Sequence, residues 1–198
     1  MNEREFETRS LAKRLWDIDF ELPWQLGDIR VEEGTFAEAL PFIQEHYPSV
    51  FGPSDRFFVE PMTEAKRRYG DEMDVFLFKD QGRVIGISLT NAQDWTTYYL
   101  RTTAILPDYR GRNLVGELVE RIQEPLRRAG VLRIESDCCP TNAPILHVLS
   151  SLGFIVTSTF VSERWGLNSR LTKFIHDEPK RAFEERYCQM IVRKRQST

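Results

Sequence analysis

Residues 103–116 read Thr-Ala-Ile-Leu-Pro-Asp-Tyr-Arg-Gly-Arg-Asn-Leu-Val-Gly. The apolar run that leads into this stretch begins at Tyr98 and stops at Pro107, and a basic turn that contains a glycine follows. From Leu114 onward, apolar residues recur at the spacing of a helix as far as Leu126. The pattern predicts a strand, a tight turn and a helix start, and the rest of the chain is organised around this unit.

The turn between this strand and helix suits an anion. The first N–H groups of a helix have no partner within the helix, and they lie at the positive end of its dipole. Arg110 and Arg112 add full positive charges, and Gly111 lets the backbone come close to a ligand. We therefore expect a pyrophosphate to bind here, and the simpler alternative is a solvated basic turn.

Two motifs resemble those of one known family. The stretch from Leu106 to Arg112 is similar to the coenzyme A motif of the GNAT acyltransferase superfamily, which typically reads Pro-Glu-Tyr-Arg-Gly-Lys-Gly-x-Gly or Ala. Asn142, followed by Leu-Gly-Phe at 152–154, is similar to a second family feature. By the order of its expected elements, the resemblance extends over roughly residues 28–175.

The first motif departs from the family at two positions. Asn113 and Val115 stand where family members usually carry small residues. Asparagine tolerates the left-handed backbone conformation, but valine does not allow the close approach of a ligand that glycine allows. The geometry of the bound diphosphate is therefore expected to differ from the family's.

The resemblance implies how coenzyme A would be held. In the family, two central strands splay apart, and the pantetheine arm bonds to the exposed backbone edge of the first of them. The N–H of Ile105 would meet the thioester carbonyl, and Asn142 would bond to the pantetheine arm, although asparagine is also a favoured helix cap without any ligand. The coenzyme A residues implied in this way are Thr103, Ala104, Ile105, Leu106, Arg110, Gly111, Arg112, Asn113, Leu114, Val115, Gly116 and Asn142.

The acid and base of the family are weakly marked in this chain. Many members carry a tyrosine as general acid seven residues after the motif asparagine, where this chain has Leu149. A carboxylate is frequent at the position that Tyr99 occupies, and residues 95–105 contain none. An ordinary tyrosine, with a pKa of about 10, is a poor base at neutral pH, so we expect Tyr99 to act as an acid or to lead protons out through water. Glu135, on the neighbouring strand, is the best candidate for the base.

The composition is that of a single globular domain. The chain has 198 residues, of which 41% are hydrophobic and 29% are charged. No apolar run reaches membrane-spanning length, and the mixed charges of the N-terminus are unlike a signal peptide. We expect one GNAT-like domain over 1–198, with an N-terminal extension at about 1–27 and a C-terminal extension at about 176–198. The expected location is the cytoplasm, and no membrane partner is expected.

The three cysteines, Cys138, Cys139 and Cys188, have neither the pattern of a disulfide framework nor the spacing of metal ligands. We therefore expect no metal. Cys138 could face the thioester, but the simpler interpretation is a small buried hydrophobic residue.

Charge is distributed unevenly along the chain. Residues 1–100 contain 11 Lys and Arg against 19 Asp and Glu, a net of −8, whereas residues 101–198 contain 16 against 11, a net of +5. The formal net charge of −3 argues against a nucleic-acid partner. The acidic half would suit a cationic amine acceptor, and the alternative is two differently solvated faces.

Periodicity places the remaining elements. Strands are expected at 29–31, 74–80, 83–91, 98–106, 131–138 and 154–161, and helices at 2–16, 35–47, 62–70, 114–128, 142–152 and 179–187. Either 170–175 or 187–192 would complete the sheet. The implied fold is α/β (α+β): a mixed, mostly antiparallel central sheet of about six to seven strands, with strands 4 and 5 splayed, flanked by helices.

In the family, the early helices and the loop that follows them shape the acceptor pocket. Here that loop is expected at 48–61. The pocket candidates are His46, Tyr47, Phe51, Phe57 and Phe58, each of which also fits a packed or surface position.

The function implied by the resemblance is that of an acyl-coenzyme A-dependent N-acyltransferase. Most simply, it transfers acetyl from acetyl-coenzyme A to a primary amine of a small molecule by direct attack in a ternary complex. One alternative is a protein or peptide amine as the acceptor. The leucine at position 149 motivates another, a non-catalytic sensor that binds acyl-coenzyme A. A homodimer is left open.

Overall fold

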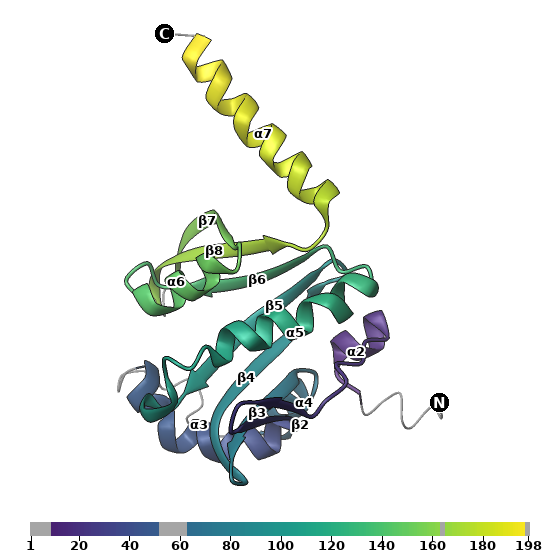
Figure 1. Cartoon of the computed structure of the whole chain (residues 1–198), viewed down its shortest axis with the longest axis vertical. Coiled ribbons are helices and arrows are strands. Elements are labelled where there is room, and N and C mark those ends of the chain that lie inside the picture. The colour runs from purple at the N-terminus through teal and green to yellow at the C-terminus, as the bar shows by residue number, and fades with distance from the viewer. Residues whose placement is uncertain (1–8, 52–62, 163–164, 197–198) are drawn as a thin grey trace.

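The computed structural model describes residues 9–51, 63–162 and 165–196 and has a single eight-stranded sheet (Figure 1). The strands are β1 (Trp24–Leu26), β2 (Ile29–Gly34), β3 (Asp74–Asp80), β4 (Arg83–Asp94), β5 (Thr97–Ile105), β6 (Arg133–Cys138), β7 (Ile155–Ser162) and β8 (Gly166–Phe174). The helices are α2 (Leu11–Trp16), α3 (Phe36–Phe51), α4 (Glu64–Asp71), α5 (Leu114–Arg128), α6 (Ala143–Ser151) and α7 (Asp177–Gln196), with a short 3₁₀ turn at Pro107–Tyr109.

The strand order is β1-β2-β3-β4-β5-β6-β8-β7, and every neighbouring pair is antiparallel except β5 and β6. The parallel pair is joined through α5, as a strand–helix–strand connection requires. The mixed, mostly antiparallel sheet is thus confirmed. Its eighth strand is β1, a three-residue strand that was not expected because Trp24–Leu26 is too short to show a period.

The sheet splits between β5 and β6. These strands pair only from Thr97 to Leu100 on β5 and from Arg133 to Ser136 on β6. Beyond that point β5 stays with β4, whereas β6 stays with β8. Arg101 is left without a partner on β4, because Leu100 and Thr102 pair with consecutive residues there. The expected splay is therefore present, and a bulge marks its start.

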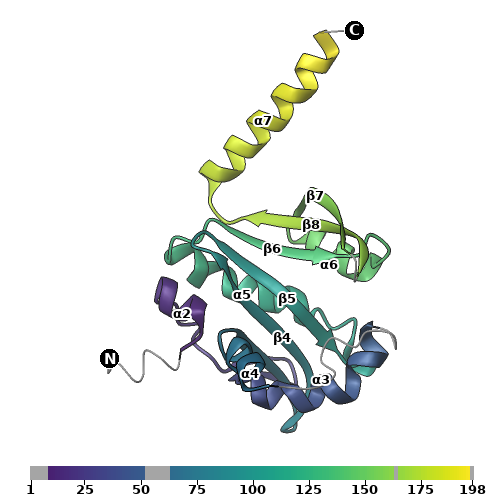
Figure 2. The same ribbon diagram turned by 180° about the vertical axis from the view of Figure 1, so that it is seen from behind.

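Helices cover both faces of the sheet. Figures 1 and 2 show α5 on one face and α3 on the other. The alternation of β3 follows this division, because Phe76 and Phe78 belong to the core cluster beneath α5, whereas Val75 and Leu77 belong to the cluster beneath α3. The central strands lie between the two clusters and are buried on both faces. They therefore form a rigid support for the splayed region.

The segment before β2 is part of the core. Ile18, Phe20 and Trp24 are buried in the cluster beneath α5. Ser10 begins α2 as its N-cap, and its hydroxyl also donates to the buried carboxylate of Asp74, which accepts a second hydrogen bond of 2.7 Å from Tyr98. This network fastens α2 to the sheet. The predicted N-terminal helix therefore begins at Leu11 within the described residues, because the chain enters it through that cap.

The C-terminal half corrects one prediction and decides another. β8 is the hairpin partner of β7 and lies between it and β6, so 170–175 rather than 187–192 completes the sheet. The alternative strand or extended tail at 187–192 is wrong, because those residues continue α7. A short run of aromatic and β-branched residues cannot be assigned to strand or helix by periodicity alone. Figures 1 and 2 show α7 extending away from the sheet.

The early helices differ slightly from expectation. α3 continues to Phe51, past the start of the loop predicted at 48–61, and the rest of that loop lies outside the described residues. Thr63 caps α4 with its side chain, which sets the helix start at Glu64. Among the described residues, no helix is both long and apolar enough to cross a bilayer.

Candidate active site

A cavity of about 500 Å³ opens where β5 and β6 separate; we call it the β5–β6 cavity. Four of the sequence-predicted site residues line it: Tyr99, Thr103, Val115 and Asn142. Its walls come from β5, the first turn of α5, the end of β6 and α6. The side chains that close its far side include Phe160, Trp165 and Asn168 from the β7–β8 hairpin. The gap in the sheet is therefore a real hollow with both polar and apolar walls.

The open edge of β5 offers backbone groups to this gap. The N–H of Leu106 donates to the carbonyl of Ile85 on β4 at 2.9 Å. Because N–H groups alternate in direction along a strand, those of Thr103 and Ile105 point away from β4. Thr103 lines the cavity, whereas Ala104, Ile105 and Leu106 are absent from its walls. Of the predicted edge residues, Thr103 thus has the most direct access to a ligand in the cavity.

The turn at the start of α5 has the backbone that an anion needs. Asn113 is the N-cap residue in the left-handed region, with φ of 57°, and its side chain makes no capping bond. The first helical N–H groups are therefore left for another acceptor. Gly116 leaves room for the Asn113 side chain in this position, because a Cβ at 116 would come within 2.1 Å of the Asn113 Oδ1. The tolerance of asparagine for this conformation, expected from the sequence, is confirmed.

The two arginines of the turn have partners within the chain. Arg110 donates from Nε to the carbonyl of Ile105 at 3.0 Å and so ties the turn to the strand end. Arg112 lies 3.2 Å from Asp28 and stacks over the Tyr109 ring at 4.9 Å. Both side chains are exposed. They lie beside the open helix start, but neither is among the residues that line the β5–β6 cavity.

Two residues at the α6 side of the cavity, Asn142 and Leu149, bear on expectations from the sequence. Asn142 is the N-cap residue of α6, yet its side chain makes no capping bond, and its exposed amide lines the cavity. Leu149 is buried in the core cluster and also lines the cavity, so the position of the family's tyrosine is apolar here. Cys138 is buried as well, and burial raises the pKa of its thiol, which keeps the thiol protonated.

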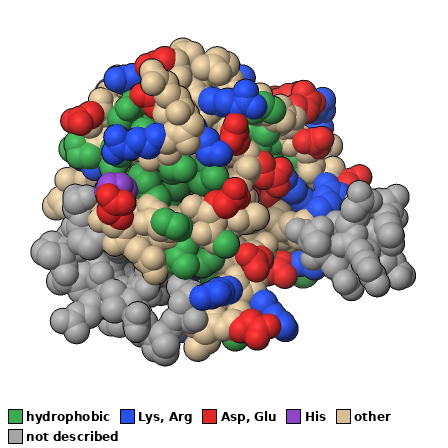
Figure 3. Space-filling view, turned by 90° about the horizontal axis from the view of Figure 1, so that it is seen from below, with side chains coloured by type: hydrophobic (Ala, Val, Ile, Leu, Met, Phe, Trp, Pro, Cys, Tyr) green, Lys and Arg blue, Asp and Glu red, His purple; other side chains and the backbone are tan. Residues whose placement is uncertain are grey.

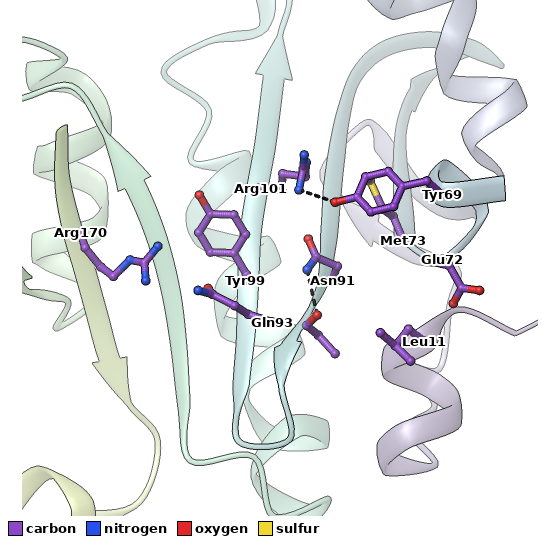
Figure 4. Close-up of a pocket in the computed structure, with 10 residues that line it drawn as sticks. Leu11, Tyr69, Glu72, Met73, Asn91, Gln93, Tyr99, Arg101 and Arg170 are labelled. Carbon is purple, nitrogen blue, oxygen red and sulfur yellow. Dashed lines mark hydrogen bonds between the residues drawn. The ribbon is translucent and has the colours of Figure 1, made fainter. Parts of the chain in front are cut away.

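A second cavity, of about 400 Å³, is also lined by Tyr99, and Figure 4 shows the residues around it. We call it the β4–α4 cavity. Its walls are Leu11 from α2, Tyr69, Glu72 and Met73 from and after α4, Asn91, Ala92 and Gln93 from β4, Tyr99 and Arg101 from β5, and Arg170 from β8. Two of these residues, Tyr99 and Arg101, also line the β5–β6 cavity. The two hollows therefore meet at these side chains.

Tyr99 is held by a charged network. Its hydroxyl donates to Asp137 at 3.0 Å, and Arg170 donates to the same carboxylate through two bonds of 2.8 Å each. Burial, and next the nearby Asp137 carboxylate, raise the pKa of Tyr99. The phenol therefore stays protonated at neutral pH and presents its free lone pairs where the cavities meet. Asp137 was missed in the sequence, where only its alternation with Glu135 along the strand could have indicated it.

Glu135 lies in a different setting. Its carboxylate is 3.3 Å from Arg170 and 3.2 Å from Arg133, and Thr172 donates to it at 3.3 Å. Although it pairs with Tyr99 in the sheet register, it lines neither cavity. This placement argues against Glu135 as the base and in favour of a part in holding Arg170.

Of the predicted acceptor-pocket residues, His46 is the one whose side chain the structure describes. His46 packs against Phe42 on α3, with ring centroids 4.8 Å apart, and lines neither hollow. The structure describes only the backbone of Tyr47 and Phe51, and Phe57 and Phe58 lie outside the described residues. Among the residues that the structure describes, no cluster of three or more His, Cys, Asp or Glu could hold a metal ion.

The charge asymmetry of the sequence is partly cancelled in space. Arginines of the basic half pair with acids of the acidic half, as in Arg112–Asp28, Arg128–Glu21 and Arg133–Asp94. On the face shown in Figure 3, basic and acidic side chains are interspersed. The two halves are thus not two separate fields of opposite sign.

Solved structures with the same fold are numerous. The putative acetyltransferase yncA from Salmonella typhimurium, solved with its cofactor acetyl-CoA, is 15% identical with a TM-score of 0.60 and covers 77% of this chain and 96% of its own. A spermidine N-acetyltransferase chimera from Vibrio cholerae and hSSAT is 15% identical with a TM-score of 0.60, covering 75% and 96%. The ribosomal-protein-S5-alanine acetyltransferase from Vibrio fischeri is 14% identical with a TM-score of 0.58, covering 79% and 98%. At these identities the likeness is one of fold.

The sequence comparison identifies the family itself. No curated protein matches the chain significantly. The sequence model of the acetyltransferase (GNAT) family, however, matches residues 39–154, which is more than half of the chain and contains α5, the open edge of β5 and Asn142. The protein therefore belongs to the acetyltransferase (GNAT) family and is an acyltransferase of the kind that uses acetyl-coenzyme A.

Proposed function

We propose that the protein is an N-acetyltransferase that transfers the acetyl group of acetyl-coenzyme A to the primary amine of a small molecule. One observation carries the proposal: two cavities, with otherwise different lining residues, both reach Tyr99 and Arg101. The β5–β6 cavity would hold the pantetheine arm of the donor, and the β4–α4 cavity would hold the acceptor. Donor and acceptor could then be bound together, and their reacting atoms would meet at Tyr99.

The donor would be held mainly by backbone groups. The N–H groups that start α5, together with Arg110 and Arg112 after reorientation of their side chains, would bind the phosphates. The amide of Asn142 would bond to the pantetheine arm. We assign the thioester carbonyl to the N–H of Thr103 in preference to that of Ile105, because Thr103 lines the cavity. A fixed N–H donor at this oxygen stabilises the charge that develops on it.

The chemistry needs no covalent enzyme intermediate. The neutral amine attacks the thioester carbonyl carbon, and a tetrahedral intermediate forms. Its C–S bond then breaks, and the thiolate leaves. The Tyr99 hydroxyl can relay a proton in one concerted step: it turns the proton that it donates to Asp137 toward the departing sulfur while it takes one from the new ammonium nitrogen, so that no free phenolate forms. Holding the two substrates together supplies much of the remaining rate enhancement.

The size of the acceptor cavity favours a small molecule over a protein. Its walls come from α2, α4, β4, β5 and β8, and its volume is about 400 Å³. One solved structure of this fold is named a spermidine N-acetyltransferase chimera, and another is named a ribosomal-protein-S5-alanine acetyltransferase. The fold therefore admits both classes of acceptor. A cytoplasmic location is part of the proposal, because a reducing compartment would keep the adjacent thiols Cys138 and Cys139 free.

The direct test is thiol release from acetyl-coenzyme A in the presence of a broad panel of amines. Acetylated product with equimolar free coenzyme A would support the proposal. Stoichiometric binding of acetyl-coenzyme A without product from any amine would instead favour the non-catalytic sensor, which the apolar Leu149 motivates.

A further inference from the structure

The β4–α4 cavity contains a cation that no carboxylate of the described residues neutralises. Three charged side chains line the cavity: Glu72, Arg101 and Arg170. Glu72 is engaged by Arg14, and Arg170 is engaged by Asp137 and Glu135. No described carboxylate lies within 4.0 Å of Arg101. Its polar partner is instead the neutral hydroxyl of Tyr69, at 3.1 Å.

The position of Arg101 is set by the sheet. Arg101 is the unpaired bulge residue at the point where β5 leaves β6, so its side chain is directed by the backbone rather than by an ion pair. Figure 4 shows its guanidinium group beside the Tyr69 hydroxyl, above Asn91. Its group also lies 5.5 Å from the centre of the Tyr69 ring. A half-buried guanidinium with most of its donors unused is ready to bind a planar anion through paired N–H bonds.

Asn91 adds an acceptor to the same cavity. Its Nδ2 donates to the carbonyl of Ala92 at 2.9 Å, which fixes the orientation of the amide. Its Oδ1 is buried and has no hydrogen-bond partner. Buried acceptors are rarely left unpaired, and the natural complement of this one is an N–H group from a bound molecule.

We propose that the acceptor is an amine that also carries a carboxylate group, as an amino acid does. Arg101 and the Tyr69 hydroxyl bind the carboxylate, Asn91 Oδ1 accepts from the amine, and the amine nitrogen lies toward Tyr99. This inference rests on the proposed acetyl transfer for its chemistry, but the binding step stands without it. It narrows the cationic amine acceptor that the acidic half of the sequence suggested, because an amine without an anionic group would meet Arg101, which no described carboxylate neutralises.

The test uses pairs of amines that differ by one anionic group. Tyrosine is compared with tyramine, and phosphoethanolamine with ethanolamine; spermidine represents the cationic class. Each is titrated by calorimetry into the full-length protein saturated with coenzyme A, and each is also assayed for thiol release with acetyl-coenzyme A. We expect the carboxylated member to bind about tenfold or more tightly than its partner. Preference for spermidine, or for the phosphorylated amine alone, would overturn the carboxylate assignment.

Variants then assign the effect to Arg101. Arg101→Gln should weaken binding of the carboxylated amine about tenfold and leave tyramine within about twofold. Tyr69→Phe, at a side chain that is 57% exposed and so tolerant of change, should give a smaller loss in the same direction. Arg127→Gln is the control, because Arg127 is an exposed arginine paired with Glu124 outside both cavities.

The two proposals fail in different ways. Tight, Arg101-dependent binding of the carboxylated amine without any acetyl transfer would sink the enzymatic function and keep this inference. Acetyl transfer to tyrosine that is no faster than transfer to tyramine, and that Arg101→Gln does not slow, would do the reverse. Failure of every amine to bind the coenzyme A complex would overturn the inference as well.

Discussion

The β5–β6 cavity and the β4–α4 cavity meet at Tyr99, but they are lined by different segments of the chain. The first is lined by polar and apolar residues of the β5 edge, the first turn of α5, the end of β6, α6 and the β7–β8 hairpin. The second is lined by polar and apolar side chains from five segments, which range from Leu11 to Arg170. A ligand in the first would be recognised mainly by backbone geometry, and a ligand in the second by side chains. The chain can thus keep one donor while its acceptor changes.

The largest expected effect concerns Tyr99, one of the two residues that line both cavities. Tyr99→Phe should lower turnover about 10²–10⁴-fold, because it removes the hydroxyl that hands a proton to the leaving group. The affinity for acetyl-coenzyme A should stay within about twofold, since the ring remains. Steady-state kinetics and calorimetry would measure the two quantities.

Tyr109→Phe is the matched control for this substitution. Its hydroxyl bonds to Asp80 at 2.7 Å, and it lines neither cavity. Unchanged turnover in Tyr99→Phe would remove the tyrosine from the mechanism, and equal losses in both variants would point to a general loss of structure.

The next largest effect is expected at the turn before α5, where the phosphates of the donor would bind. Arg110→Ala combined with Arg112→Ala should weaken coenzyme A binding about tenfold to a hundredfold, because two charge-assisted contacts are lost. Binding of a dephosphorylated pantetheine fragment should be spared. If both ligands lose affinity equally, the phosphate assignment fails, and the damage must come from the lost Arg110 bond to Ile105.

A smaller effect is expected that changes binding of the acceptor in the β4–α4 cavity and leaves binding of coenzyme A unchanged. Ser10→Ala removes the cap of α2 and its bond to Asp74, so the free energy of unfolding should fall by about 2 kcal/mol. Since α2 contributes Leu11 to the β4–α4 cavity and nothing to the other one, the KM for the acceptor should rise while coenzyme A affinity stays constant. Chemical denaturation and kinetics would check this, and a parallel loss of coenzyme A affinity would break the proposed independence.

The smallest effect is in the pH profile. Burial raises the pKa of Tyr99, so its phenol keeps its proton to a higher pH than an ordinary tyrosine does. The value of kcat/KM should therefore rise as the acceptor amine loses its proton, and it should not fall again near the ordinary tyrosine pKa of about 10. Glu135→Gln should leave the shape of this profile unchanged, and a lost limb in that variant would restore Glu135 as the base.

The same comparison explains what could be predicted from the sequence. The β5–turn–α5 unit is local, so its strand, its left-handed Asn113 and its open helix start could all be predicted from one continuous stretch. The parallel pairing of β5 with β6 followed from the connection through a helix. The expected gap between them needed the family resemblance, because no local pattern indicates where two strands part.

The acceptor side could not be predicted in this way. Tyr69, Asn91 and Arg101 form no motif, and although Asn91 and Arg101 come from neighbouring strands, only the tertiary fold brings Tyr69 of α4 to the same cavity. Asp137 was overlooked in favour of Glu135, because strand alternation places both on the same face and does not say which one the neighbouring arginines occupy. Residues 187–192 likewise could not be predicted to be helical, because the run is too short for its periodicity to distinguish a helix from a strand.

The most direct test of the two-cavity account is a calorimetric titration of acetyl-coenzyme A into two blocking variants. Val115→Trp fills the β5–β6 cavity from the first turn of α5, and Leu11→Trp fills the β4–α4 cavity from an exposed position. The account predicts that Val115→Trp weakens acetyl-coenzyme A binding about tenfold or more, whereas Leu11→Trp leaves it at the wild-type value. Wild-type binding in Val115→Trp, or equal losses in both variants, would contradict the assignment of donor and acceptor to separate cavities.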